Sequence, residues 1–161
     1  MPCNRGFTFD RRWTLQDSRG RGIKPGALHI ALTEVDEWDE GIGFVRESAR
    51  LNPYHPTYRY MYLAIDSMMS GDYAAALVET TIFDRRFEFW GPLLHGLALA
   101  GLGHADEAQR EIAAARELEP SLEAAITSTT DFPEDVRDFL VNRLDSTPSA
   151  TQRARPRTPP H

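Results

Sequence analysis

LGHADEAQREIAAARELEP, residues 102–120, is the stretch that decides the fold we expect for this chain. It begins with a turn at Gly103-His104 and then places a small residue, Ala108, four positions before Ile112. Residues four apart lie on the same face of a helix, so this pair predicts one packing face. Leu118-Glu119-Pro120 closes the stretch, because a proline cannot continue a helix. The sequence therefore predicts one helix bounded by a turn and a proline.

Two earlier segments, residues 36–53 and 70–84, repeat this pattern. Each begins with a turn and carries a small residue four positions before a second packing residue. These pairs are Gly41 with Val45 and Ala76 with Thr80. The first segment also ends in Leu-x-Pro, and its Pro53 lies 67 residues before Pro120. That separation is close to two periods of about 34 residues, the length of a repeat built from two helices.

A partner helix is expected before each of these segments. Residues 57–69 and 90–102 carry apolar and small residues at helical spacing, and we expect a close approach between helices at Gly96. Residues 27–35 keep helical spacing as well, but Pro25-Gly26 leaves this first helix barely three turns. The body of the chain is therefore predicted to consist of helices arranged in pairs.

Helix pairs at this period resemble tetratricopeptide repeats, which are antiparallel helix hairpins that bury their apolar faces only by stacking. The resemblance covers roughly residues 27–120. It implies an all-α fold of about two and a half repeats. After it, TDFPEDVRDFLVNRL (130–144) carries helix-start residues and one apolar stripe, and residues 121–129 are expected to form a short helix before it. We expect residues 130–144 to supply the capping helix that a solenoid needs.

A narrower resemblance comes from the order of features in the second and third repeats and the segment after them. These features are Gly71-Asp72-Tyr73, Phe89-Trp90, residues 97–103, Glu107-Ala108 and Pro133-Glu134-Asp135. Their order is similar to the C-terminal tetratricopeptide region of large bacterial regulators, whose N-terminal part is an adenylate/guanylate cyclase or a winged-helix domain. No metal-binding aspartate pair of a cyclase and no helix-turn-helix is evident. The resemblance therefore implies the accessory region of a bacterial regulatory system without its output domain.

Composition divides the chain into three parts: an irregular or disordered segment at 1–26, the helical domain at 27–145, and a disordered tail rich in Arg and Pro at 146–161. The two end segments carry net charges of +4 and +3, so that −13 lies between them within a total of −6. An acidic body repels phosphates, which disfavours nucleic acid as a partner. A nucleic-acid-associated regulator that uses the basic tails is the alternative function.

The sequence predicts neither a catalytic nor a cofactor-binding site. The five histidines are scattered and Cys3 is the one cysteine, so we expect no metal site and no disulfide. Acidic pairs fall at turns and helix starts, where they offset the helix dipole, and no phosphate loop or nucleophile elbow appears. We therefore do not expect an enzyme. No apolar run reaches the roughly 20 residues of a membrane span and no signal peptide is evident, which predicts a cytoplasmic protein.

The site that we expect is an apolar groove. In tetratricopeptide proteins the first helix of each pair lines the concave face, and by this resemblance the lining residues come from the helices at 57–69 and 90–102. They are Tyr58, Met61, Tyr62, Ile65, Met69, Trp90, Leu94 and Leu97. Methionine repacks readily and aromatic side chains anchor partners, so the groove suits a helix or peptide. The chain's own C-terminal helix, a protein partner or a second copy could fill it, in preference to a small molecule.

Overall fold

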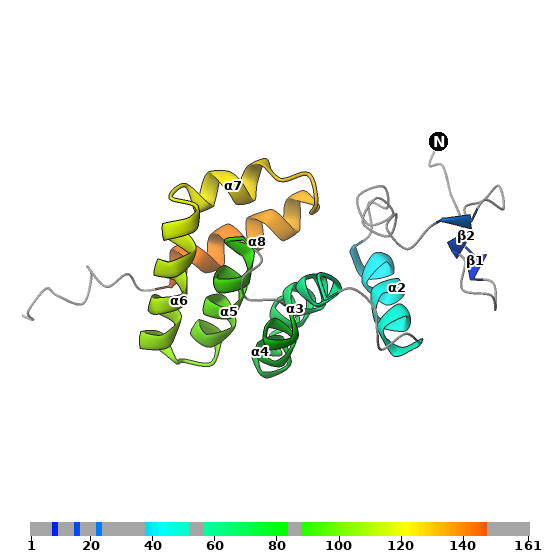
Figure 1. The fold of residues 1–161 in the computed structure, drawn as a ribbon, viewed down its shortest axis with the longest axis horizontal. Coiled ribbons are helices and arrows are strands. Elements are labelled where there is room, and N and C mark those ends of the chain that lie inside the picture. Colours follow the sequence, from blue (N-terminus) through cyan, green and yellow to red (C-terminus); the bar gives the residue numbers. More distant parts are fainter. Residues whose placement is uncertain are drawn as a thin grey trace, which may run out of the picture.

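The computed structural model describes residues 8–9, 15–16, 22–23, 38–51, 57–83 and 88–147. Seven helices and three short strands occur within these ranges (Figure 1). The helices are α2 (Trp38–Leu51), α3 (Arg59–Met69), α4 (Tyr73–Ile82), α5 (Trp90–Gly101), α6 (Ala105–Leu118), α7 (Leu122–Ser128) and α8 (Glu134–Ser146). The prediction of a helical body is confirmed. The helix expected at residues 27–35 and most of the tail lie outside the described residues.

Three two-residue strands form an antiparallel sheet in the order β1-β2-β3. They are β1 (Thr8–Phe9), β2 (Leu15–Gln16) and β3 (Gly22–Ile23). Leu15 pairs with Phe9 on one side and with Ile23 on the other. These residues lie within the segment for which the sequence predicts irregular structure. Two-residue strands are too short to produce the alternation by which a strand is recognised in a sequence.

The turns predicted at Gly71-Asp72 and Gly103-His104 are confirmed, and both depend on glycine, whereas the turn expected at the start of segment 36–53 lies outside the described residues. Gly71 after α3 and Gly103 after α5 have φ values of +83° and +81°, a left-handed conformation that other residues adopt only with strain. The Asp72 amide donates to the Ser67 carbonyl at 2.8 Å, which satisfies an orphan carbonyl at the end of α3. The Asp72 side chain then caps α4 by accepting from the Ala75 amide at 3.0 Å. Each turn therefore ends one helix sharply and lets the next helix turn back against it.

Close packing between consecutive helices is strongest where the sequence placed small residues. α5 lies along α6, α3 along α4, and α4 along α5. An ideal Cβ at Gly96 would lie 2.9 Å from Ile112 Cγ1 and 3.1 Å from the Ala108 carbonyl oxygen, so α5 and α6 leave no room for a methyl group there. Ala76 and Ala108 are completely buried. The close approach predicted at Gly96 is therefore confirmed.

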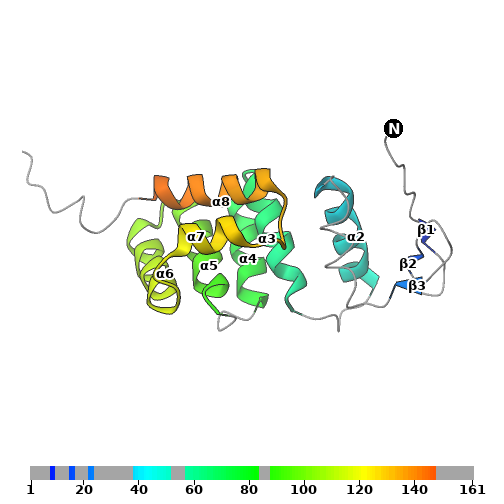
Figure 2. The ribbon, with the colours of Figure 1, turned by 90° about the horizontal axis from the view of Figure 1, so that it is seen from above.

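The C-terminal helices α7 and α8 run side by side against the α3–α6 bundle (Figure 2). Their inward residues and Phe132 from the link between them belong to the same hydrophobic core as the bundle. They are Leu122, Ile126, Phe132, Val136, Leu140 and Leu144. This core also receives Trp38 and Val45 from α2. The final two helices are therefore part of the folded body, and α8 extends to Ser146, just beyond the predicted end of the domain at 145.

A candidate protein-interaction site

Three aromatic residues from three different helices surround the side chain of Phe132. We call Trp38 of α2, Tyr62 of α3 and Trp90 of α5 the aromatic site. The centroid of the Phe132 ring lies 6.2 Å from Trp38, 5.6 Å from Tyr62 and 5.4 Å from Trp90, with interplanar angles of 65°, 66° and 79°. All three contacts are edge-to-face, the arrangement that the aromatic quadrupole favours. The three rings of the aromatic site thus surround one aromatic side chain through edge-to-face contacts.

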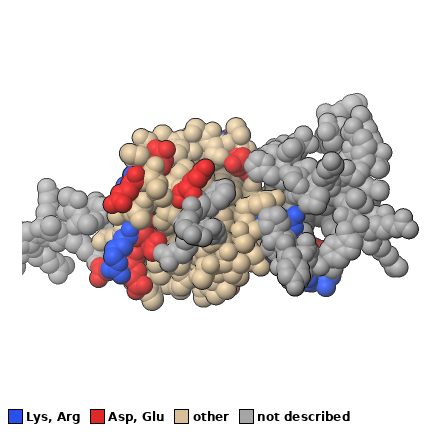
Figure 3. Space-filling model, in the orientation of Figure 1, with Lys and Arg blue, Asp and Glu red and all other residues tan. Residues whose placement is uncertain are grey.

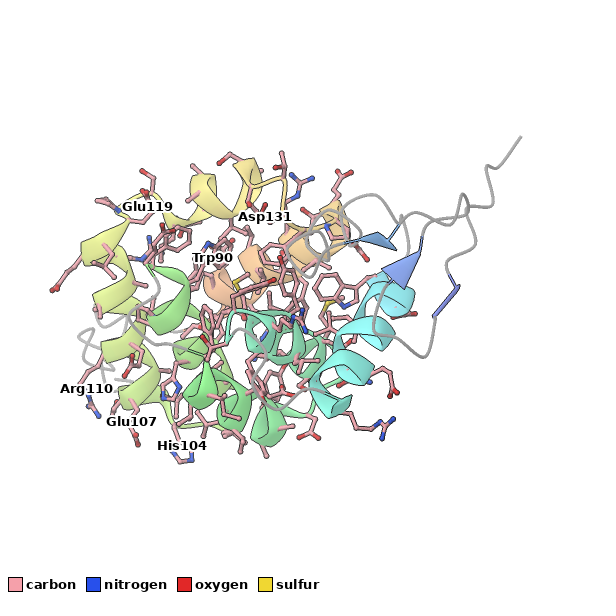
Figure 4. All side chains as sticks on the ribbon, turned by 45° about the vertical axis from the view of Figure 1, so that its right-hand side comes forward. Trp90, His104, Glu107, Arg110, Glu119 and Asp131 are labelled. Atoms are coloured by element: carbon pink, nitrogen blue, oxygen red, sulfur yellow. The ribbon has the colours of Figure 1, made fainter. Side chains whose placement is uncertain are left out.

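The backbone around Phe132 is fixed from both sides. Phe132 lies in the link between α7 and α8, followed by Pro133, which is the extended N-cap of α8 with ψ 160°. From α8, the guanidinium of Arg137 donates through Nη1 to the carbonyls of Thr127 and Thr129, both at 3.0 Å. Figure 4 shows Asp131 at this link and Trp90 in the interior below it. The link therefore has a fixed backbone shape that directs the Phe132 side chain into the core.

The aromatic site is closed to solvent. The exposed fractions are 7% for Trp38, 1% for Tyr62, 7% for Trp90 and 3% for Phe132. Burial raises the pKa of the Tyr62 phenol well above its usual range, and the nearby carboxylate of Asp131 adds to the effect. The phenol therefore remains protonated at neutral pH. Tyr62 packs here with its ring against Phe132.

Most of the residues predicted to line an open groove are buried inside the chain. Tyr58 and Met69 are half-buried, and the remainder are buried. The buried ones are Met61, Tyr62, Ile65, Trp90, Leu94 and Leu97. Two of them, Tyr62 and Trp90, contact Phe132 from the chain's own C-terminal segment. Of the occupants that the sequence left open, the chain itself is the one that the structure contains. In this structure these residues therefore do not line an open groove.

The reason for this self-filling is physical. A tethered segment is present at an effective concentration of about millimolar or higher, so it competes strongly with any partner in solution. Burying a Trp, a Tyr and a Phe together also removes a large apolar area from water, at about 25 cal/mol per Å². A groove of this composition therefore does not stay empty when the chain carries a suitable helix.

Sequence reasoning missed two of the four aromatic residues at this site. Trp38 opens the first repeated segment just after its turn, and Phe132 lies immediately before Pro133, outside the apolar stripe of α8. Both were visible as aromatics next to helix starts. Their meeting could not be predicted because they are 94 positions apart and periodicity reports only faces within one helix.

Polar groups lie between the first three described helices. Arg46 of α2 forms an ion pair with Asp66 of α3. Glu79 of α4 accepts a hydrogen bond from Ser67 of α3, and burial raises the pKa of Glu79 above its usual range despite this bond. Within the described residues, Glu79 Oε2 has no hydrogen-bond partner. These contacts join α3 to α2 and to α4.

The histidine at position 95 has a structural contact. Its Nδ1 lies 3.0 Å from the hydroxyl of Thr80, which is completely buried and joins α4 to α5. The Thr80 hydroxyl also donates to the carbonyl of Leu77 at 3.0 Å. Over residues 38–51, 57–83 and 88–147, no group of three or more His, Cys, Asp or Glu is placed to hold a metal ion.

The charged surface gives no separate site on the face drawn in Figure 3. Acidic side chains are scattered over it with fewer basic ones, and the described part of that face has no continuous basic patch. Arg116 of α6 forms two hydrogen bonds with Glu123 of α7, at 2.5 Å and 3.3 Å. The Arg-rich end segments, on which the nucleic-acid alternative depends, lie outside the described residues except for the six strand residues, Ser146 and Thr147.

Comparison of the chain with protein-family models, with curated protein sequences and with solved structures gives no significant match. The resemblance to tetratricopeptide repeats therefore depends on the residues of this chain alone. None of the helices in the described part of the chain combines the length and the apolar character needed to cross a bilayer.

Proposed function

We propose that this chain is a protein-interaction module of the tetratricopeptide type that binds a helical segment through its aromatic site. The observation that supports this proposal is the packing of the Phe132 ring against Trp38, Tyr62 and Trp90. A site that already accepts an aromatic residue at the start of a helix has the chemistry to accept the same feature from another molecule. The resemblance to bacterial regulators supports an accessory role in a regulatory system.

The composition of the site favours protein recognition over small-molecule chemistry. Tryptophan and tyrosine are enriched among the residues that dominate binding energy at protein interfaces, and they act best in fully desolvated pockets. Tyr62 and Phe132 are buried, and their ring centroids lie 5.6 Å apart, which is within the range of a favourable aromatic pair. Each such pair contributes about 0.5–1.5 kcal/mol beyond its area. Three pairs on one ring make Phe132 the expected anchor.

The test weakens the binding of the chain's own C-terminal segment to the aromatic site and then adds that segment as a separate peptide. Replacing Phe132 by Ala in the full chain is expected to cost about 3–5 kcal/mol, which weakens the hold of the tethered segment at least 10²-fold. A fluorescent peptide of residues 119–147 should then bind this variant with a dissociation constant on the order of 10 μM. The intact chain should bind it only near the effective concentration of its own segment, about millimolar. Fluorescence anisotropy measures both values.

The matched control is Phe139→Ala on α8. Phe139 is a half-buried aromatic of the same segment, and the ring contacts of the aromatic site are made by Phe132. This variant should bind the peptide far more weakly than Phe132→Ala. A Phe132→Ala chain that is folded by circular dichroism and binds no peptide at about 100 μM would show that the aromatic site does not recognise a helix from another molecule.

A further inference from the structure

Helices α7 and α8 form one unit that is attached to the bundle through side chains. Within the described residues each makes its most extensive backbone approach with the other. Arg137 of α8 holds the end of α7 through the carbonyls of Thr127 and Thr129. We call residues 122–147, including Phe132, the exchange segment. It can change position without losing its internal contacts.

The contacts between the exchange segment and the bundle do not require the two to belong to one molecule. Phe132 enters the aromatic site, and the guanidinium of Arg143 lies over the Tyr73 ring, 5.0 Å from its centroid. Glu123 pairs with Arg116 at the end of α6. Each of these contacts forms equally well when the segment comes from a second copy of the chain, because both copies have the same residues.

The link between α6 and α7 is short and is not helical. It consists of Glu119, Pro120 and Ser121, and Glu119 is extended with φ −137° and ψ 97°. The carboxylate of Glu119 accepts a hydrogen bond from the Ser121 amide at 2.9 Å. A short proline-containing link between two packed units is the kind of hinge at which identical elements are exchanged between protomers.

An exposed leucine lies directly before this link. Leu118 is 61% exposed, as the last residue of α6. In a symmetric exchange the two links pass each other near the two-fold axis, which brings the two Leu118 side chains together. Exchange would therefore bury an apolar side chain that the closed chain leaves in water.

We propose that the partner of the aromatic site is a second copy of this chain, and that two molecules exchange residues 122–147 so that Phe132 of each enters the site of the other. This inference rests on the proposed function, because it needs an aromatic site that accepts a helix in trans. Exchange leaves the contacts of the aromatic site unchanged. The dissociation constant of the dimer is therefore set by the effective concentration of the tethered segment, about millimolar. Contact between the two Leu118 side chains lowers it from that value.

The first test measures the mass of the full chain by size-exclusion chromatography with light scattering, from about 10 μM to about 1 mM. The protein is unfolded in guanidinium and refolded at each concentration, so that slow opening does not hide the dimer. The dimer fraction should rise across this range. Leu118→Glu should weaken dimerisation at least about tenfold, because it places two like charges at the axis. Val78→Glu, also at a position 61% exposed but on α4, should leave it unchanged.

The second test distinguishes exchange from side-by-side association. In a Cys3→Ser background, a donor dye is attached at Ala113→Cys on α6 and an acceptor at Asn142→Cys on α8, two exposed positions. Chains that carry one dye each are refolded together at about 1 mM. Exchange predicts energy transfer between them with the efficiency measured in one doubly labelled, dilute chain, after allowance for mixed pairs. A dimer with a different efficiency overturns the inference.

The two proposals fail separately. If Phe132→Ala binds the 119–147 peptide while the full chain stays monomeric at about 1 mM, the aromatic site binds helices and a second copy is not its partner. Equal dimerisation of the Leu118→Glu and Val78→Glu variants would also overturn the exchange. If the folded Phe132→Ala variant binds no peptide, the proposed function itself is wrong.

Discussion

At Gly96, the backbone of α5 lies against α6 with no space for a methyl group. Gly96→Ala should destabilise the chain by about 1–3 kcal/mol, because a Cβ there would meet Ile112 and the Ala108 carbonyl. This cost exceeds the roughly 1 kcal/mol by which alanine is more favourable than glycine in a helix interior. Urea denaturation followed by circular dichroism measures the change.

Gly43 provides the matched control for this substitution. It is exposed in the interior of α2, and a Cβ built on it meets no atom within 4 Å. Gly43→Ala should therefore stabilise the chain by about 0.5–1 kcal/mol through helix propensity alone. Opposite signs for the two substitutions support the close approach of α5 and α6. A stabilising Gly96→Ala would contradict it.

At the residue scale, the sequence predicted packing positions better than binding positions. Gly96, Ala76 and Ala108 were identified because small residues recur at similar places in the aligned segments; Gly96 and Ala108 lie at the contact of α5 with α6, and Ala76 is completely buried. Trp90 was expected to line an open groove, and in the structure it is buried. Burial of that face depends on Phe132, and no local pattern in the sequence relates these two residues.

At the scale of elements, Glu79 gives the α3–α4 pair a pH dependence. Burial disfavours the charged carboxylate and raises the pKa of Glu79 above its ordinary value of 4.5. A raised folded-state pKa means that the stabilising contribution is complete below the unfolded pKa and is lost as the pH rises through the folded pKa. The ion pair of Arg46 with Asp66 and the carboxylate of Asp72 are the other charges that act on this group.

Glu79→Gln should therefore stabilise the chain at pH 7, by no more than about 1 kcal/mol because solvent screens a half-buried group. The amide keeps a partner for the Ser67 hydroxyl without the cost of burying a charge. The advantage should disappear below the ordinary pKa of 4.5, where the wild-type carboxyl is also neutral. Thermal melts at a series of pH values measure this. Glu117→Gln, at an exposed position on α6, controls for the change in net charge. An equal gain in stability there would show that the burial of Glu79 is not the cause.

The helices themselves were largely predictable, because turn residues and proline mark their ends. The stretch from 102 to 120 contains α6 (Ala105–Leu118), and the turn at Gly71-Asp72 separates α3 from α4 as expected. The short helix expected at 121–129 is α7, and the predicted capping helix is α8. The relation between these last helices and the aromatic site was not predictable, since it depends on a loop held by Arg137.

At the scale of the whole molecule, the chain carries both an aromatic site and a ligand for that site. In the structure the two are in contact within one chain, and in the proposed exchange the same contacts would join two chains at high concentration. No new interface needs to be formed apart from the region of Leu118, which is 61% exposed. We therefore expect an oligomeric state that depends on protein concentration and on the concentration at which the chain was folded.

Phe132 packs on Trp90 and so holds the C-terminal helices against the bundle, and a double-mutant cycle measures this contact. Trp90→Leu, Phe132→Leu and the double variant are unfolded in urea and compared with wild type. We expect a coupling free energy of at least about 0.5 kcal/mol, as for contacting aromatic pairs. The same cycle with Phe139→Leu in place of Phe132→Leu should be additive. Additivity within about 0.5 kcal/mol for Trp90 and Phe132 would show that this contact does not hold the C-terminal helices in place.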